Sequence, residues 1–401
     1  MKAGWSIKPL AHLCEAFADG DWVESKDQSP EGIRLVQTGN VGEGVFKDRS
    51  EKARYISEET FKRLRCTEIF EGDCLISRLP DPVGRSAIIP SVGERMITAV
   101  DCTIVRFDKS QYLPTFFNFY SQSNDYLSTI AKECTGTTRS RISRNNLGLT
   151  PIPVPPLPEQ HRIVAILDEA FAGIATAKAN AEKNLQNARA LFESHLQKVF
   201  TERGEGWQLK TLEEISTTFG RGKSRHRPRN APHLYGGHYP FVQTGDIRNA
   251  DHIITEYSQT YSEAGLAQSK LWPKGTICIT IAANIAETAI LGFDACFPDS
   301  VIGVVANPKE ADVNFIEYLL QSFKARLQLL GKGSAQANIN MGTFEHERFP
   351  FPPVIKQMQI VAKLDALGTE TQRLESLYQQ KLTALDALKK SLLHQAFSGQ
   401  L

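Results

Sequence analysis

The sequence has no apolar run long enough to cross a membrane. Nowhere in its 401 residues is there a stretch approaching the roughly 18 apolar residues that a span requires. The opening segment, MKAGWSIKPLAHLCEAFADG, lacks the uninterrupted apolar core of a signal peptide. We therefore expect a cytoplasmic protein with no membrane partner.

Closely paired cysteines are also missing. The seven cysteines are scattered singly, and no two form a Cys-x-x-Cys pair. This argues against a zinc ribbon or a dithiol redox motif. Single scattered cysteines are typical of proteins in a reducing compartment.

No complete catalytic motif is present. An adenine methyltransferase needs an acidic or amide residue before Pro-Pro and an aromatic residue after it, whereas the two Pro-Pro pairs here read VPPL and FPPV. A phosphate-binding loop needs a glycine five residues before Gly-Lys-Ser, but TTFGRGKS has Thr217 at that place. His161, His195 and His394 lack metal-ligand spacing. We expect a binding protein with no catalytic residue, cofactor or metal ion of its own.

The sequence does contain a long internal repeat. PIPVPPLPEQHRIVAILD and FPFPPVIKQMQIVAKLD share a Pro-Pro pair, a glutamine and Leu-Asp at a constant offset of 197 residues, so that Gln160 matches Gln357. Earlier in each copy, WSIKPL resembles WQLKTL, VQTGN resembles VQTGD, and GDCLIS resembles GTICIT. The chain is therefore two copies of one unit of about 200 residues.

Each copy ends in a long helical pattern without proline. Apolar residues recur in steps of three and four, which predicts a coiled-coil seam. In the first copy the predicted seam is Leu167, Ala170, Ile174, Ala177, Ala181, Asn184, Ala188, Leu191 and His195. In the second it is Leu364, Leu367, Thr371, Leu374, Tyr378, Lys381, Leu385, Leu388 and Leu392. Because an exposed seam needs a partner, we expect the two helices to pair with each other. The alternative is that each helix lies separately on its own core.

The remainder of each copy has short β-rich runs such as DCTIVRF and VIGVVAN, separated by Gly, Pro and Asn turns. The predicted fold class is α+β, with two similar globular domains, two long antiparallel helices and an internal pseudo-two-fold repeat. The predicted boundaries are 1–156 and 203–354 for the recognition domains, and 157–202 and 355–401 for the spacer helices.

Basic segments free of acidic residues are the candidate binding sites. The formal net charge is only +1, so the evidence for a nucleic-acid partner lies in local clusters. Arginine can contact guanine with two hydrogen bonds, and Asn or Gln can do the same with adenine. The alternative for any one residue is an ordinary solvated loop. The candidate DNA-binding residues are Arg78, Arg85, Arg139, Arg141, Arg144, Arg221, Lys223, Arg225, Arg227, Arg229, Gln336 and Asn338.

The ordered set of repeated segments resembles the specificity subunit of type I restriction-modification enzymes. The resemblance covers essentially the whole chain, from Trp5 through both Pro-Pro segments to the terminal LLHQAFSGQL. It implies that each globular domain reads one half of a split, asymmetric site in double-stranded DNA, and that the helices set the gap. It also implies two methylation subunits docked on the chain, with restriction subunits joining them. S-adenosylmethionine is then expected on the methylation subunit, in agreement with the missing motifs.

Two other functions remain open at this point. One is a tandem-repeat coiled-coil adaptor for protein partners without DNA binding, which would explain the helices but not the basic loops. The other is a complete enzyme that methylates or cleaves by itself, which the missing motifs argue against.

Overall fold

The computed structural model describes residues 4–136, 139–226, 228–282, 285–332, 339 and 341–401. It divides into two compact units. Unit 1 comprises Met1–Glu182 and Gln379–Leu401, and unit 2 comprises Lys183–Tyr378. Each unit therefore combines one globular domain with part of each long helix. The predicted boundaries follow the chain and assign each long helix to a segment of its own.

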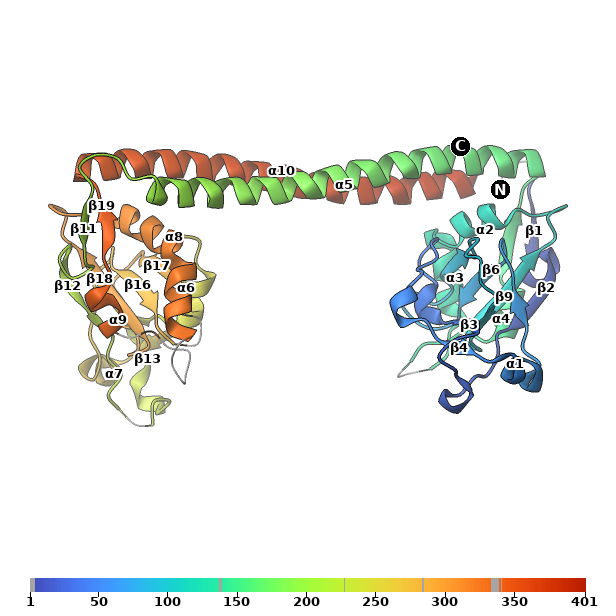
Figure 1. The fold of residues 1–401 in the computed structure, drawn as a ribbon, viewed down its shortest axis with the longest axis horizontal. Helices are drawn as coiled ribbons and strands as arrows, with labels where there is room; N and C mark the ends of the chain where they lie inside the picture. The colour runs from blue at the N-terminus through green and yellow to red at the C-terminus, as the bar shows by residue number, and fades with distance from the viewer. Residues whose placement is uncertain (1–3, 137–138, 227, 283–284, 333–338, 340) are drawn as a thin grey trace. The chain divides into compact units, whose positions relative to one another are not determined.

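The globular domain of unit 1 contains three sheets with short helices beside them (Figure 1). The main sheet has the order β2-β9-β6-β7, formed by Cys14–Asp19, Cys102–Phe107, Cys74–Ser77 and Ser86–Ile88. A second sheet has the order β4-β3-β8-β5, formed by Tyr55–Ile56, Ile33–Val36, Met96–Thr98 and Glu68–Ile69. β1 (Ser6–Pro9) pairs with β10 (Pro151–Val154) beside the long helices. The helices are α1 (Glu58–Leu64), α2 (Pro114–Tyr120), α3 (Asn124–Lys132) and α4 (Arg144–Leu149).

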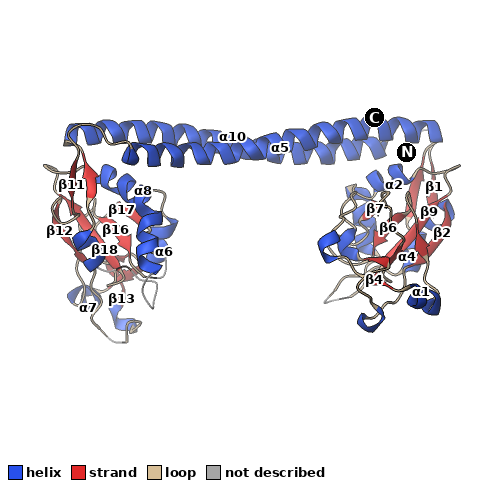
Figure 2. Cartoon of the chain, in the orientation of Figure 1, coloured by secondary structure: helices blue, strands red, loops and turns tan. Residues whose placement is uncertain are grey.

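Unit 2 repeats this plan with differences at the edges (Figure 2). Its main sheet has the order β12-β18-β16-β17-β14, formed by Ser216–Arg221, Val301–Ala306, Ile277–Thr280, Thr288–Leu291 and Ile253–Ile254. The smaller pairs are β11 with β19 (Gln208–Lys210, Phe349–Phe351) and β13 with β15 (Tyr235–Phe241, Gln259–Tyr261). The helices are α6 (Thr244–Asn249), α7 (Glu263–Ala267), α8 (Val313–Lys332) and α9 (Met341–His346).

The main sheets correspond strand for strand, since β2, β9, β6 and β7 occur in the same order as β12, β18, β16 and β17. The repeated GDCLIS and GTICIT segments lead into β6 and β16. Gly72 and Gly275 start these segments with φ of 87° and 83°, a left-handed conformation that glycine adopts without strain. The repeat in sequence is thus a repeat in topology.

The long helices are α5 (Leu157–Thr201) and α10 (Val354–Ser398). In unit 1 Lys178 of α5 forms an ion pair with Asp386 of α10, and in unit 2 Arg189 lies 2.9 Å from Glu375. Partners descend along α10 as they ascend along α5, so the helices are antiparallel. The predicted fold class, including the paired helices, is confirmed.

The detailed seam prediction is only partly correct. Leu167, Ile174, Ala181 and Ala188 are buried at seven-residue intervals, but the predicted seam residues Asn184, Leu191, His195, Lys381 and Leu388 are exposed. Neighbours one position along are less exposed instead, namely Leu185, Phe192, Leu196, Leu382 and Lys389. A straight helix has 3.6 residues per turn, so its buried face drifts by about 20° per heptad from a strict 3.5 repeat.

Both helices end against a hydrophobic core. Phe200, near the end of α5, packs against Phe315 of unit 2 at 5.3 Å between ring centroids. Phe397, near the end of α10, packs against Phe116 of unit 1 at 5.3 Å. The end of each helix is therefore anchored by aromatic burial.

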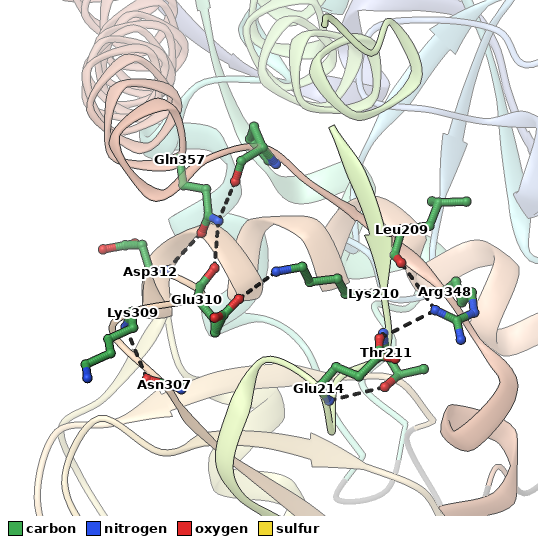
Figure 3. A network of polar contacts seen from close by, with 11 residues as sticks. Leu209, Lys210, Thr211, Glu214, Asn307, Lys309, Glu310, Asp312, Arg348 and Gln357 are labelled. Atoms are coloured by element: carbon green, nitrogen blue, oxygen red, sulfur yellow. Dashed lines mark hydrogen bonds and ion pairs between the residues drawn. The ribbon is translucent and has the colours of Figure 1, made fainter. Parts of the chain in front are cut away.

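A polar network joins α10 to the globular part of unit 2 (Figure 3). The side chain of Gln357, fully buried, donates to the carbonyl oxygens of Pro352 and Glu310 and accepts from the backbone N–H of Asp312. Lys210 of β11 binds the Glu310 carboxylate at 2.6 Å. These contacts fix the start of α10 to the base of its own domain.

Candidate nucleic-acid interface

In unit 1 the arginines of the 139–144 segment lie at one end of the main sheet. The Arg141 Nη2 atom is 3.0 Å from Asp101 Oδ1, just before β9, and Arg144 Nη1 is 3.9 Å from Asp19 Oδ2 at the end of β2. The backbone N–H of Ile142 donates to the carbonyl oxygen of Arg78, which follows β6. The segment is thus held across the ends of neighbouring strands, while Arg139 is exposed.

The Arg78 side chain is buried beneath this segment. It is 4% exposed, and its Nη2 atom lies 3.1 Å from Asp19 Oδ1 and donates to the Val100 carbonyl at 2.6 Å. Burial lowers the pKa of the Arg78 guanidinium, although the carboxylate of Asp19 opposes this. The observed contacts make Arg78 an internal support for the strand ends, and DNA contact by this residue stays a prediction.

Arg85 is also buried, and among the described residues its side chain donates hydrogen bonds to backbone carbonyl groups only. Its guanidinium donates to the carbonyl oxygens of Thr38 and Val41 on one side. On the other it donates to those of Leu79, Pro80 and Pro82. Arg85 therefore ties the VQTGN segment to the loop that follows β6. Its predicted DNA contact likewise stays a prediction.

In unit 2 the basic segment lies at the corresponding end of the main sheet. Arg221 ends β12, and its Nε donates to the Asp299 carbonyl at 2.7 Å. The Arg229 Nη2 atom donates to both carboxylate oxygens of Asp299, at 2.9 and 2.8 Å. Lys223 and Arg225 are exposed. Arg227, Gln336 and Asn338 lie outside the described residues.

The loop carrying Lys223 and Arg225 is fixed by its backbone. The Gln268 Oε1 atom accepts from the backbone N–H groups of Arg225 and His226, and Ser269 Oγ donates to the Lys223 carbonyl. Gln268 and Ser269 follow α7. The basic side chains are therefore presented from a backbone held in place by side-chain hydrogen bonds.

Lys270 is a candidate that the sequence analysis missed. Its Nζ atom lies 3.6 Å from the centre of the Trp272 ring, a cation–π contact. Burial lowers the pKa of Lys270, and the positive charge of Lys223 lowers it further. This repulsion means that Lys270 adds to the same positive cluster. A single lysine in QSKLW carries no clustering signal in sequence.

The two main sheets carry opposite charges at equivalent ladder positions. Asp19 of β2 pairs with Thr103, the second residue of β9, and Arg221 of β12 pairs with Ile302, the second residue of β18. The position is the same in both sheets, but a carboxylate in unit 1 is replaced by a guanidinium in unit 2. The units therefore share a scaffold and differ in the chemistry of the strand ends.

Within the described ranges, no group of three or more His, Cys, Asp or Glu side chains is placed to hold a metal ion. Across the same part of the chain, no helix is both long and apolar enough to span a membrane.

The family model of the type I restriction modification DNA specificity domain matches the chain twice, over residues 2–186 and 204–384. The chain belongs to this family of specificity subunits. The role of the family is DNA target recognition, and the resemblance inferred from the sequence is confirmed. The alternative of an adaptor without DNA binding is set aside.

Known members are similar over most of the chain. The putative MjaX specificity subunit of Methanocaldococcus jannaschii is 22% identical over 99% of this chain and 93% of its own length. The EcoKI specificity subunit of Escherichia coli is 23% identical, covering 75% of this chain and 68% of that subunit.

Solved structures share the fold. The HsdS subunit of Thermoanaerobacter tengcongensis superposes with a TM-score of 0.66 at 19% identity, covering 100% of this chain and 98% of that one. A chain from a structure of a type I R-M system, concerned with complex assembly and conformational transition, gives a TM-score of 0.80 at 19% identity, covering 100% of this chain and 99% of that chain.

Proposed function

We propose that each unit of this specificity subunit reads one half of a split, asymmetric site in double-stranded DNA. The proposal rests on the arginines at the corresponding strand ends of the two main sheets. The scaffold repeats, but Arg141 and Arg144 supply its charge in unit 1, whereas Arg221 and Arg229 do so in unit 2. Two copies of one reader with different contact residues would recognise different words.

The long helices are proposed to set the gap between the half-sites. Each helix contributes its first part to one unit and its last part to the other. Half-site spacing on DNA mirrors the spacing of the elements that read it. A fixed helix length then corresponds to a fixed number of unread base pairs.

The partners follow from the family. Two methylation subunits dock on the chain, restriction subunits join that core, and S-adenosylmethionine is bound by the methylation subunit. The chain itself recognises DNA and performs no catalysis, and the complex works in the cytoplasm. The related structure of a type I R-M system, which concerns complex assembly, supports such partners.

The test is the methylation pattern that the chain directs. Expressed with its methylation subunit, it is expected to direct methylation at a motif with two specified words and an unspecified gap. Purified alone with a labelled methyl donor, it is expected to transfer no label to DNA. A contiguous motif would contradict two-part reading, and transfer by the chain alone would contradict the non-catalytic role.

A further inference from the structure

Two aspartates, Asp101 and Asp299, lie just before the strands β9 and β18, one ladder position apart when the two main sheets are aligned through Thr103 and Ile302. Each uses its backbone carbonyl to accept a hydrogen bond from an arginine at a neighbouring strand end. The two hydrogen bonds differ in kind: the donor is the backbone N–H of Arg78 in unit 1, at 2.9 Å, and the side-chain Nε of Arg221 in unit 2, at 2.7 Å. Both main sheets thus have an aspartate at the strand ends where the basic segments lie.

Each carboxylate holds a second arginine, and the two units take that arginine from different loops. Asp101 binds Arg141, which comes from the segment before α4, and Asp299 binds Arg229, which comes from the loop after β12. An aspartate precedes both strands, but its ladder position and the loop that supplies its arginine differ between the units. An ion pair between an aspartate and an arginine is therefore the feature that the strand ends of both main sheets share.

General DNA affinity does not account for either carboxylate, and folding stability does not account for that of Asp299. The Arg229 and Asp299 side chains are 51% and 36% exposed, and those of Arg141 and Asp101 are 47% and 28% exposed. Solvent-exposed ion pairs add little to folding stability. A negative charge beside a basic segment also opposes phosphate binding. What remains is the effect of the carboxylate on the orientation of the guanidinium.

The geometry at Arg229 suits such a role. Both hydrogen bonds to Asp299 leave from Nη2, so Asp299 does not engage Nε or Nη1. The backbone of Arg229 is held as well, because the Tyr235 hydroxyl donates to its carbonyl at 2.8 Å. A guanidinium that is held through Nη2 has a fixed plane, so its other N–H groups point in defined directions.

We infer that Arg229 reads a guanine in the half-site of unit 2 and that Asp299 is the residue that positions it, with Arg141 and Asp101 in the same roles in unit 1. Guanine offers N7 and O6 in the major groove, which match the arginine fork. The inference rests on the proposed half-site reading and assigns a base type and a positioning residue to it.

The experiment uses the complex of the chain with its methylation subunit. Asp299→Asn removes the carboxylate charge, and Arg229→Lys keeps the positive charge but removes the fork. Methylated motifs are mapped, and binding is measured on DNA with each base of both half-sites replaced in turn. Both variants are expected to lose about 5- to 150-fold discrimination at the same guanine of one half-site. The other half-site stays unchanged, and Asp299→Asn binds non-specific DNA equally or more tightly.

The matched control is Glu370→Gln, which removes a carboxylate paired with Arg373 at 2.7 Å on α10. It changes the net charge by the same amount and is expected to leave discrimination unchanged. An intact motif in Asp299→Asn would overturn the positioning role, and so would equal losses in both half-sites or a lost thermal unfolding transition. If the unmodified complex gave no split motif, the proposed function would fail independently of these variants.

Discussion

Gln160 and Gln357 make the same three hydrogen bonds in their respective units. Gln160 donates to the carbonyl oxygens of Pro155 and Gln111 and accepts from the N–H of Leu113. Gln357 donates to those of Pro352 and Glu310 and accepts from the N–H of Asp312. The repeated segment is therefore a rigid connection. Pro-Pro ends the globular domain, and the hydrogen bonds of the glutamine hold the first turn of the helix to that domain.

We predict that Gln357→Ala destabilises unit 2 by at least ~1–3 kcal/mol, the cost of leaving a buried polar group unsatisfied. Gln160→Ala should do the same in unit 1. Gln→Glu at either position should also destabilise, because a carboxylate cannot donate to the two carbonyl groups. Denaturant unfolding measures the effect. Gln186→Ala, at an exposed position of α5, is the control. Equal stability of Gln357→Ala and the control would show that Gln357 does not stabilise the connection between the domain and the helix.

Unit 2 is predicted to lose stability as the pH rises because of His252. Its Nδ1 atom lies 2.6 Å from Oε2 of the fully buried Glu317, and Nε2 lies 3.2 Å from Asn314 Oδ1. Burial by itself would lower the pKa of His252, but the hydrogen bond to Glu317 and its charge, together with Asn314 and Asp365, outweigh burial, so the pKa is raised above 6.5. The contribution is complete below pH 6.5 and is lost as the pH passes the raised pKa of the folded state.

The measurement is the free energy of unfolding across this pH range for the unmodified chain and for His252→Gln. The difference between them should shrink as the pH rises. The exposed His238→Gln variant is the control. A difference that is independent of pH would show that the charge of His252 does not contribute.

Lys223 and Arg225 are predicted to bind phosphates of the DNA backbone. Replacing both by Ala should weaken DNA binding at every sequence and flatten the dependence of log K on log salt by about one unit for each phosphate that is no longer neutralised. Binding measured over a series of salt concentrations tests this. The exposed lysines Lys309 and Lys356, both changed to Ala, form the charge-matched control. An unaltered slope would place the 221–229 loop away from DNA.

Lengthening both helices is predicted to lengthen the gap in the recognised motif. The Lys178–Asp386 ion pair shows where the insertions must match: four residues after Ala177 in α5 and four after Asp386 in α10. Four residues add about 6 Å of helix, or one to two base pairs at about 3.4 Å each. The methylated motif should keep both words and gain that gap. An altered word with the old gap, in a stable complex, would disprove the spacer role.

Much of the fold could be read from the sequence because its signals are local or repeated. The constant 197-residue offset, the Pro-Pro segments and the apolar steps of three and four required no knowledge of distant contacts. The seam was predicted less well in the second half of each helix, where Asn184 and Lys381 are exposed, because a strict heptad count ignores the drift of a 3.6-residue helix. Periodicity thus determined which helices pair but not every residue that faces the partner.

The sequence by itself determined that two similar units carry acid-free basic segments, and it placed Arg141, Arg221 and Arg229 among the candidates. Only the tertiary structure decided that Arg78 and Arg85 turn inward, and that Asp299 meets Arg229 from 70 residues away. The physical reason is that strand register is set by long-range packing. Register places Asp19 and Arg221 at equivalent ladder positions of the two main sheets, and no local sequence pattern shows this equivalence.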